Sequence, residues 1–387
     1  MWHRERLLAV LLAGLAATAS AGEPRARDLG IPFDFGTPGR WNAITDVPGV
    51  EVGHVTLIEG DSIRTGVTAI LPRGRGDAAL DQCFGGYFSL NGNGEMTGVP
   101  WLLESGLLEG PVMLTNTNAV GVVRDAVIAY ARERWGRVML WSLPVVAETW
   151  DGPLNDIYAR RVSDAHAVQA IDAGRGGEVA EGNVGGGTGM VCYEFKGGIG
   201  TASRRLLPAA GGYVLGVLVQ ANFGLREQLR IAGVPVGREL PVDRPRSRDQ
   251  GSIIVVVATD APLLPHQLAR LARRSALGLA RTGSVSGDGS GDLMIAFSTA
   301  NPRVGDTEST VDLQMLPNAR MEPLFGATVG ATEEAIVNAL VAARSMSGHE
   351  GARFDALPHQ RVREILRRHG VAVDGPPGAA GRSPASR

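Results

Sequence analysis

The feature that most constrains the fold is a run of five consecutive β-branched aliphatic residues, IIVVV at Ile253–Val257. Residues of this type favour strands, and an unbroken apolar run predicts a strand that is buried on both faces. The residues just before it, 244–250, are charged or polar apart from one proline. Gly251 and Ser252 stand on the boundary, so a hydroxyl group lies at the mouth of a buried strand.

The bulk composition is that of a soluble globular protein. The chain has 387 residues, 44% of them hydrophobic and 20% charged, enough for one large domain or two ordinary ones. A net charge of −2 gives no global field that would attract nucleic acid or an anionic membrane. The 53 glycines occur in runs without a period, which favours tight turns around a site over a flexible or collagen-like chain.

The amino terminus has the pattern of a secretory signal peptide. Arg4 and Arg6 precede the apolar stretch Leu7–Ala17, and Ala19-Ser20-Ala21 fits an A-x-A cleavage site. We therefore predict that residues 1–21 are removed and that the mature chain begins at Gly22. An uncleaved anchor or a buried helix is the alternative, but the apolar run is short for a bilayer. The expected location is the periplasm of a two-membrane bacterium.

Expected strands and helices alternate along the mature chain, which predicts a mixed α and β class with one large core. Helices are expected over residues 122–135, 163–174, 265 onward and 323–343, and strands over 137–146, 211–224, 253–259 and 292–300. Residues 238–250 are the most linker-like interior stretch, and the tail 370–387 is expected to be disordered.

Several familiar chemistries are excluded by missing motifs. The sequence contains no H-E-x-x-H, no paired C-x-x-C, no G-x-S-x-G and no G-x-x-x-x-G-K-[ST]. We therefore expect no metal and no cofactor. The glycine-rich segment GNVGGGTGM, Gly182–Met190, could cradle a phosphate, but a turn that shapes a pocket wall is the favoured interpretation. Cys83 and Cys192, the two cysteines, are expected to be separate buried thiols.

The usual bases for a serine nucleophile are scarce. His54, His166 and His266 each lie beside apolar residues, which is typical of structural histidines, and Lys196 is the only lysine. An α-amino group is an alternative base because its pKa near 8 is close to working pH. A serine at a chain's own amino terminus has such a base built in.

A cut between Gly251 and Ser252 would create that arrangement. Glycine leaves the preceding carbonyl uncrowded and tolerates a strained turn. The Ser252 hydroxyl could then attack that carbonyl, and water could hydrolyse the resulting ester. The alternative is a plain Gly-Ser turn that leads into a strand.

The segment GSIIVVVATDAPLLPHQLARLARR resembles the self-cleavage region of the L-aminopeptidase/D-esterase (DmpA) family, which includes D-aminopeptidases and β-peptidyl aminopeptidases. Further similar segments, in the family's order between Trp41 and Ala343, are NAITDVPGVEVGHVT, NGNGEMTG, TNTNAVG, GNVGGGTGM, KGGIGTASR, LVQANFG and SGDLMIAFST.

This resemblance implies an α+β fold, a four-layer αββα sandwich similar to that of the amino-terminal-nucleophile hydrolases but with different strand connectivity. It also implies a precursor that cleaves itself into an α chain, residues 22–251, and a β chain, residues 252–387, both parts of one catalytic domain. A tetramer of αβ units, without nucleic-acid or membrane partners, is the implied assembly.

The resemblance also assigns roles to residues. It makes Ser252 the nucleophile, Ser290 and Asp292 the neighbouring serine and acid, and Asn222 the donor to the oxyanion. Each has a simpler alternative, since Ser290 and Asp292 could bridge a glycine turn and Asn222 could cap a strand end. Trp150, a candidate substrate-binding residue, stands where family members carry tyrosine. If that tyrosine hydroxyl assists the oxyanion or the leaving group, this protein must do without it.

Glu148 and Glu95 are both candidates for binding the amino group of the substrate, and the sequence does not choose between them. The favoured function is an exported aminopeptidase that acts on short peptides, amides or esters, with β- or D-residues as candidate substrates. Two alternatives stay open. One is an acyltransferase of the ornithine acetyltransferase type, which cleaves before threonine, and the other is a small-molecule binding protein that never cleaves.

Overall fold

The computed structural model describes residues 23–76, 81–136, 141–240, 242, 248–305 and 308–373. The predicted signal peptide lies outside this part of the chain, and so does most of the predicted tail. Residues 370–373, which were included in the predicted tail, belong to the described part, and Val373 is fully buried in the core.

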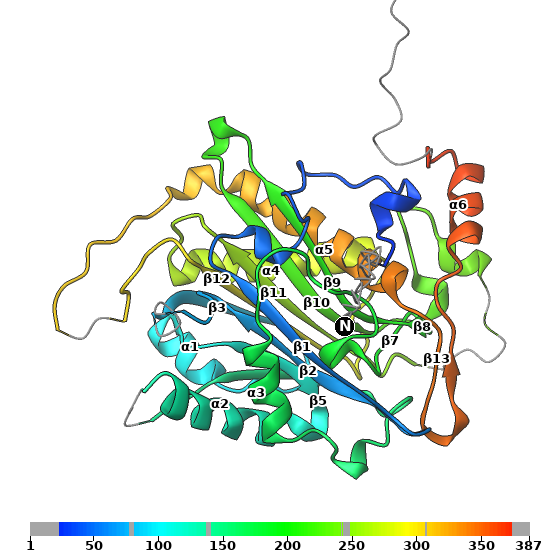
Figure 1. The fold of residues 1–387 in the computed structure, drawn as a ribbon. Coiled ribbons are helices and arrows are strands. Elements are labelled where there is room, and N and C mark those ends of the chain that lie inside the picture. Colours follow the sequence, from blue (N-terminus) through cyan, green and yellow to red (C-terminus); the bar gives the residue numbers. More distant parts are fainter. Residues whose placement is uncertain are drawn as a thin grey trace, which may run out of the picture.

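Two large sheets are stacked face to face (Figure 1). The six-stranded sheet has the order β4 (Leu107–Leu108), β3 (Cys83–Gly92), β12 (Gly291–Ser298), β11 (Ser252–Thr259), β10 (Val214–Asn222) and β9 (Gly198–Arg205). The four-stranded sheet has the order β1 (Glu51–Glu59), β2 (Ile63–Leu71), β5 (Val112–Asn116) and β6 (Val145–Thr149). Two small hairpins, β7 (Val191–Cys192) with β8 (Phe195–Lys196) and β13 (Met346–Ser347) with β14 (Arg353–Phe354), lie beside them.

Helices cover the outer face of each sheet. The long helices α4 (Pro265–Arg281) and α5 (Glu322–Ala342) pack on the six-stranded sheet, and α2 (Val120–Arg134) and α3 (Asp164–Asp172) pack on the four-stranded sheet. Shorter helices, α1 (Val99–Ser105) and α6 (His359–Arg368), lie at the margins. The predicted four-layer αββα sandwich is confirmed.

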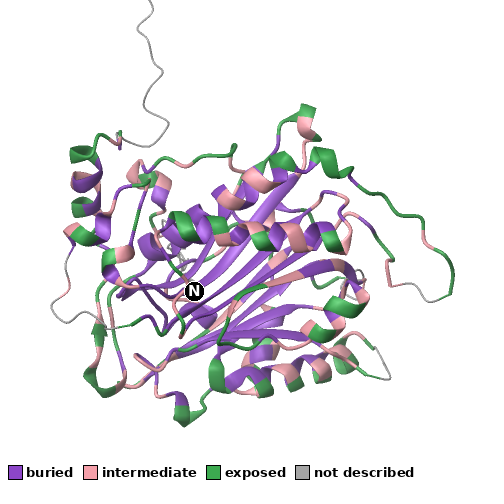
Figure 2. Cartoon of the chain, turned by 180° about the vertical axis from the view of Figure 1, so that it is seen from behind, coloured by how far each residue is buried: buried purple, intermediate pink, exposed green. Residues whose placement is uncertain are grey.

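The β-branched run explains why β11 lies at the centre. Side chains alternate along a strand, so Ile253, Val255 and Val257 enter the core beneath α4 and α5. Ile254 and Val256 point the other way, into the core between the two sheets. Both faces of this strand are therefore covered by apolar residues. Figure 2 shows the same pattern, with buried strands inside and exposed residues on the outer helical surfaces.

The boundary at residue 252 does not divide the fold in space. The six-stranded sheet takes β3, β4, β9 and β10 from residues before it, and β11 and β12 from residues after it. β11 pairs antiparallel with β10 and parallel with β12, so the proposed second chain forms the middle of a sheet that the first chain completes.

Most sequence-based expectations for single elements are correct, with one clear exception. The strand predicted over 137–146 begins only at Val145, and residues 137–140 lie outside the described part. Cys83 and Cys192 are both buried and free, as predicted.

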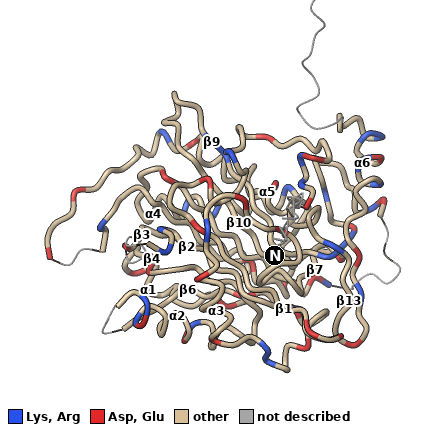
Figure 3. The backbone as a smooth tube through the Cα atoms, in the orientation of Figure 1, with Lys and Arg blue, Asp and Glu red and all other residues tan. Residues whose placement is uncertain are grey.

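Helix α5 is long and apolar enough to cross a membrane by length and composition, but 83% of that stretch is buried in the core. Charged residues lie mainly on the loops and helices around the two sheets (Figure 3).

Candidate active site

Three adjacent strand ends bring the predicted site residues together. Asn222 is the last residue of β10, Ser252 is the first residue of β11, and the two are register partners. Asp292 is the second residue of β12, where it pairs with Ile253, and Ser290 immediately precedes that strand. All four side chains are buried, so each must find its polar partners within the protein.

Ser252 lies at the mouth of the buried strand with 5% of its surface exposed. Its Oγ accepts a hydrogen bond from the backbone N–H of Gly291 at 3.1 Å. The N–H of Gly251 donates to Oδ1 of Asp249 at 3.0 Å. A Cβ atom on Gly251 would lie 1.8 Å from the carbonyl oxygen of Asn222, so only glycine fits here without a shift of the backbone.

The Asp292 carboxylate is held by two hydroxyl groups. Ser290 Oγ donates to its Oδ1 at 2.5 Å, and Ser286 Oγ donates to its Oδ2. Burial raises the pKa of Asp292, and these two hydrogen bonds oppose the increase. Ser286 was not among the predicted site residues, although it stands in the same glycine- and serine-rich segment as Ser290.

Asn222 is fixed at both ends of its side-chain amide. Oδ1 accepts from the backbone N–H of Val191 at 2.8 Å, and Nδ2 donates to the backbone carbonyl of Trp150 at 2.9 Å. An amide nitrogen carries two hydrogens, so Nδ2 retains one that can be donated to a developing negative charge.

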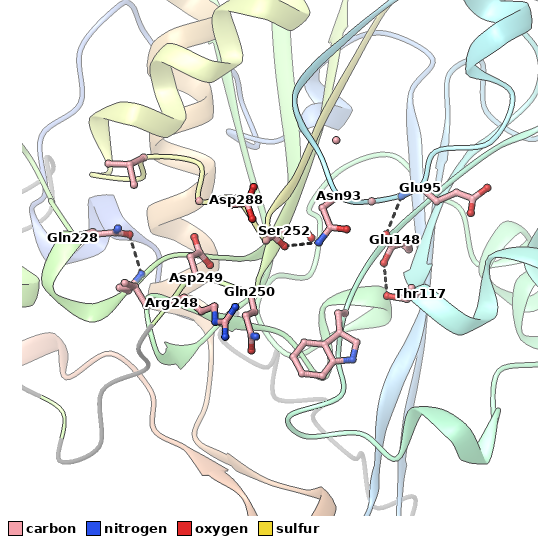
Figure 4. Close-up of a pocket in the computed structure, with 17 residues that line it drawn as sticks. Asn93, Glu95, Thr117, Glu148, Gln228, Arg248, Asp249, Gln250, Ser252 and Asp288 are labelled. Atoms are coloured by element: carbon pink, nitrogen blue, oxygen red, sulfur yellow. Dashed lines mark hydrogen bonds between the residues drawn. The ribbon is translucent and has the colours of Figure 1, made fainter.

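Ser252 opens onto a cleft of about 840 Å³. Figure 4 shows that the cleft is built from segments far apart in the sequence. Its lining residues are Gly92, Asn93, Gly94, Glu95, Thr117, Glu148, Trp150, Leu225, Gln228, Arg248, Asp249, Gln250, Ser252, Val285, Gly287, Asp288 and Gly289. Two glycine-rich loops on its border are joined, since Asn93 Nδ2 donates to the carbonyl of Gly289 at 2.9 Å.

The structure distinguishes Glu148 from Glu95, the two candidates for binding the amino group of the substrate. Glu148, at the end of β6, is 4% exposed, and its Oε1 accepts from the backbone N–H of Glu95 at 3.0 Å. Thr117 Oγ1 donates to its Oε2. Burial raises the pKa of Glu148. The exposed side chain of Glu95 points away from both Glu148 and Ser252 in Figure 4.

Trp150 contributes to the site in two ways. Its backbone carbonyl orients the Asn222 amide, and its side chain, 39% exposed, lines the cleft. A Cβ atom on Gly152 would lie 2.5 Å from the indole, so the ring rests closely on that glycine. The Trp150 indole therefore forms an apolar part of the cleft wall.

The glycine-rich segment Gly182–Met190 does not line the cleft, so its expected role as a pocket wall is wrong. Its residues are mostly buried, and added Cβ atoms on Gly186 and Gly187 would lie 2.1 Å from Gln220 Oε1 and 2.4 Å from the backbone N of Ile199. The glycines therefore allow the segment to pack against β9 and β10.

The three histidines that were read as structural lie away from the cleft lining. The His54 Nδ1 atom is 2.9 Å from Thr68 Oγ1, and burial lowers the His54 pKa to about 4. His166 accepts from the backbone N–H of Ser163 at 3.1 Å, and His266 is exposed on α4. Across the described ranges, no three His, Cys, Asp or Glu side chains are grouped so that they could hold a metal ion.

Comparisons with known proteins agree with this geometry. The model of peptidase family S58 matches residues 42–354. The chain is 50% identical over 380 residues to the beta-peptidyl aminopeptidase BapA of Sphingosinicella microcystinivorans, covering 92% of this chain and 95% of that protein. It is 45% identical over 386 residues to BapA of Sphingosinicella xenopeptidilytica, covering 93% and 95% of the two chains.

Two solved structures have similar folds. A Burkholderia sp. beta-aminopeptidase superposes with a TM-score of 0.85 at 52% identity, covering 90% of this chain and 100% of that one. The L-aminopeptidase D-Ala-esterase/amidase of Ochrobactrum anthropi, described as a prototype of the serine aminopeptidases with a variant of the Ntn hydrolase fold, gives 0.84 at 45% identity, covering 90% and 99%.

Proposed function

We propose, from the premise that this chain belongs to peptidase family S58 and is a serine aminopeptidase, that Ser252 is its nucleophile and that the chain cuts itself at Gly251–Ser252. The observation that carries this proposal is the pairing of Ser252, which lines the cleft, with Asn222 at the end of the neighbouring strand. There the hydroxyl, the scissile carbonyl of Gly251 and an amide donor belong to adjacent strand ends.

Self-cleavage would begin with attack of Ser252 Oγ on the carbonyl carbon of Gly251. The bond between that carbon and the Ser252 nitrogen breaks, an ester forms, and the hydroxyl proton passes to the new amine. Water then hydrolyses the ester, leaving a carboxylate on Gly251 and a free hydroxyl and amine on Ser252. The close packing of Gly251 against Asn222 supports this step, because it restricts the movement of the residue that carries the scissile carbonyl.

In the mature enzyme the free amine of Ser252 would accept the hydroxyl proton as Oγ attacks the substrate carbonyl. Asn222 Nδ2 would donate to the oxygen that becomes negative in the transition state. The hydroxyl of Ser290, held by Asp292, is suited to pass the proton to the leaving amine. An acyl-enzyme ester results, and water releases the residue.

Glu148 is the group best suited to bind the amino terminus of the substrate. It lines the cleft as a buried carboxylate, and an ammonium group would offset the cost of its burial. Glu95 would contribute its backbone N–H rather than its own charge. A site of this kind favours substrates with a free amino group close to the scissile bond, as an aminopeptidase requires.

Peptides with an amino-terminal β-residue are the proposed preferred substrates. This proposal is supported by the two relatives named beta-peptidyl aminopeptidase at 50% and 45% identity, whereas the Ochrobactrum enzyme is named for L-aminopeptidase and D-Ala-esterase/amidase activity. Assays of the purified protein on p-nitroanilides of L-, D- and β-amino acids would rank the three classes directly.

Two chains on a denaturing gel, with Ser252 at the amino terminus of the smaller one, are the expected result of the central test. A single intact band from active protein would contradict self-cleavage, and an intact band without hydrolysis would favour the non-cleaving binding protein.

Export and assembly are separate proposals. The sequence pattern of residues 1–21 supports secretion to the periplasm, and the resemblance to the family supports a tetramer of αβ units. Amino-terminal sequencing of the larger chain should give Gly22, and light scattering of the purified protein should give four αβ units. Activity confined to the cytosol with Met1 retained would contradict export.

A further inference from the structure

Lys196, the only lysine of the chain, is completely buried at the end of β8. Its Nζ donates to three backbone carbonyl oxygens, those of Met190 at 2.7 Å, Gly197 at 2.8 Å and Gly187 at 3.2 Å. A lysine ammonium has three hydrogens, and each has an acceptor here. Among the described residues no ion pair includes Lys196, and three carbonyl oxygens are its hydrogen-bond partners.

The peptide group between Met190 and Val191 joins this ammonium to the proposed active site. Its carbonyl oxygen accepts from Lys196, and its N–H donates to Asn222 Oδ1 at 2.8 Å. The hairpin of β7 and β8 lies beside β10 (Figure 1), so a short path of hydrogen bonds leads from Nζ to the amide of Asn222.

Hydrogen bonds in such a chain polarise one another. When a positively charged group donates to the Met190 carbonyl oxygen, the N–H of the same peptide group, that of Val191, becomes a stronger donor. This stronger hydrogen bond withdraws electron density from Asn222 Oδ1. The Asn222 Nδ2–H group then becomes a stronger donor to an oxyanion. The ammonium also fixes the position of the peptide group that orients Asn222.

We propose that Lys196 is a positioning residue of the oxyanion site, which holds and polarises the Met190–Val191 peptide group so that Asn222 stabilises the transition state. This inference rests on the proposed roles of Ser252 and Asn222. A lysine that only supports the buried glycine-rich segment would affect folding but would not act through Asn222.

Kinetics of Lys196→Met give the first test. Turnover should fall about tenfold or more, with KM within about twofold of wild type, because the lost interaction acts in the transition state. In an Asn222→Ala background the same change should cost less than about twofold, since the path to the oxyanion is already broken. An equal loss of kcat in both backgrounds, or no loss in the wild type, would overturn the proposal.

Arg73→Met is the matched control. The Arg73 guanidinium also donates to backbone carbonyls, those of Thr299 at 3.0 Å and Asn301 at 2.8 Å, but they lie beyond the opposite end of β12 from Gly291. This variant loses a cation bound to backbone carbonyls away from the cleft, so its kcat should stay within about twofold of wild type.

A second measurement needs no substitution at Lys196. With a single lysine, ¹⁵N-lysine labelling gives one Nζ signal, which can be observed at about pH 6, below the value of about 7 to which burial lowers the Lys196 pKa. An aminoalkylboronic acid that forms a tetrahedral, anionic adduct on Ser252 should shift this signal in the wild type but not in Asn222→Ala.

The ¹¹B spectrum of the same samples separates the possible failures. If the boron is tetrahedral but the Nζ signal of the wild type does not shift, the role of Lys196 is overturned. It is also overturned if the Nζ signal shifts equally in the wild type and in Asn222→Ala. If the wild type forms no adduct, Ser252 is not the nucleophile, and the inference about Lys196 fails with it.

Discussion

Asn222 and Ser252 are register partners on the antiparallel strands β10 and β11, and the backbone of Gly251 packs directly against the carbonyl group of Asn222. The proposed nucleophile, the scissile bond and the proposed oxyanion donor are therefore held by one ladder of backbone hydrogen bonds. Rigid strands position reacting groups more accurately than loops do, which suits the proposed self-cleavage at this site.

Ser252→Ala should yield a single folded chain without aminopeptidase activity, because neither the attacking hydroxyl nor the free amine can form. A denaturing gel and a p-nitroanilide assay measure the two effects. Ser275→Ala is the matched control, since Ser275 is a buried serine on α4 whose Oγ has no hydrogen-bond partner among the described residues. Hydrolysis by the Ser252 variant would show that the nucleophile is another residue.

Gly251→Ala should slow self-cleavage about tenfold or more, because its Cβ would lie 1.8 Å from the Asn222 carbonyl oxygen and displace the scissile bond. The measurement is the fraction of intact chain over time after synthesis. Gly121→Ala serves as the control, because an added Cβ at that position of α2 meets no atom within 4 Å. Wild-type maturation of the Gly251 variant would be incompatible with the close contact described here.

Asn222→Ala should lower kcat roughly 10²–10³-fold while KM changes little, because the amide acts on charge that develops only in the transition state. Maturation should also slow, since self-cleavage passes through a similar tetrahedral species. Steady-state kinetics on the fully cleaved fraction keep the two effects apart. Turnover close to that of the wild type would remove Asn222 from the mechanism.

Glu148→Gln should raise KM about tenfold or more by removing the charge that binds the substrate ammonium, whereas Glu95→Gln should change KM less than about twofold. Acidification protonates Glu148 and removes the charge that binds the substrate, so KM of the wild type should increase. Because burial raises the pKa of Glu148, this increase should begin at a higher pH than for an ordinary glutamate. The KM of Glu148→Gln should not follow this pH dependence. Equal effects of the two substitutions would contradict the assignment.

Asp151→Asn should gain stability relative to the wild type as pH rises. Asp151 is fully buried, and burial raises its pKa to about 7. The folded state therefore holds a proton that the unfolded chain releases near pH 4, so wild-type stability falls between about pH 4 and 7. Asparagine cannot ionise, and the difference in unfolding free energy should change by roughly 2–3 kcal/mol between pH 5 and 8. Urea unfolding at both pH values measures it, and a constant difference would contradict the raised pKa.

The sequence alone determined the local elements and indicated where to look for a candidate site. The run Ile253–Val257 had to be a central strand because only a layer covered on both faces can bury five β-branched residues in succession. The Gly-Ser boundary before it, in a chain with one lysine and few histidines, left a plain turn open, and only the resemblance to the DmpA family favoured Ser252 as the proposed amino-terminal nucleophile. Helix α5 was expected over 323–343 and runs over Glu322–Ala342, since its pattern is long and strongly apolar.

Contacts between distant segments were decided only by the tertiary structure. Glu148 and Glu95 looked equivalent until β6 and the loop after β3 met, and that meeting buried one carboxylate and left the other in solvent. The glycine-rich segment behind Asn222 and its link to Lys196 likewise depend on how β7 and β8 pack beside β10. Strand pairing joins residues that are far apart along the chain, and no local pattern specifies which polar atoms such pairing brings within hydrogen-bond distance.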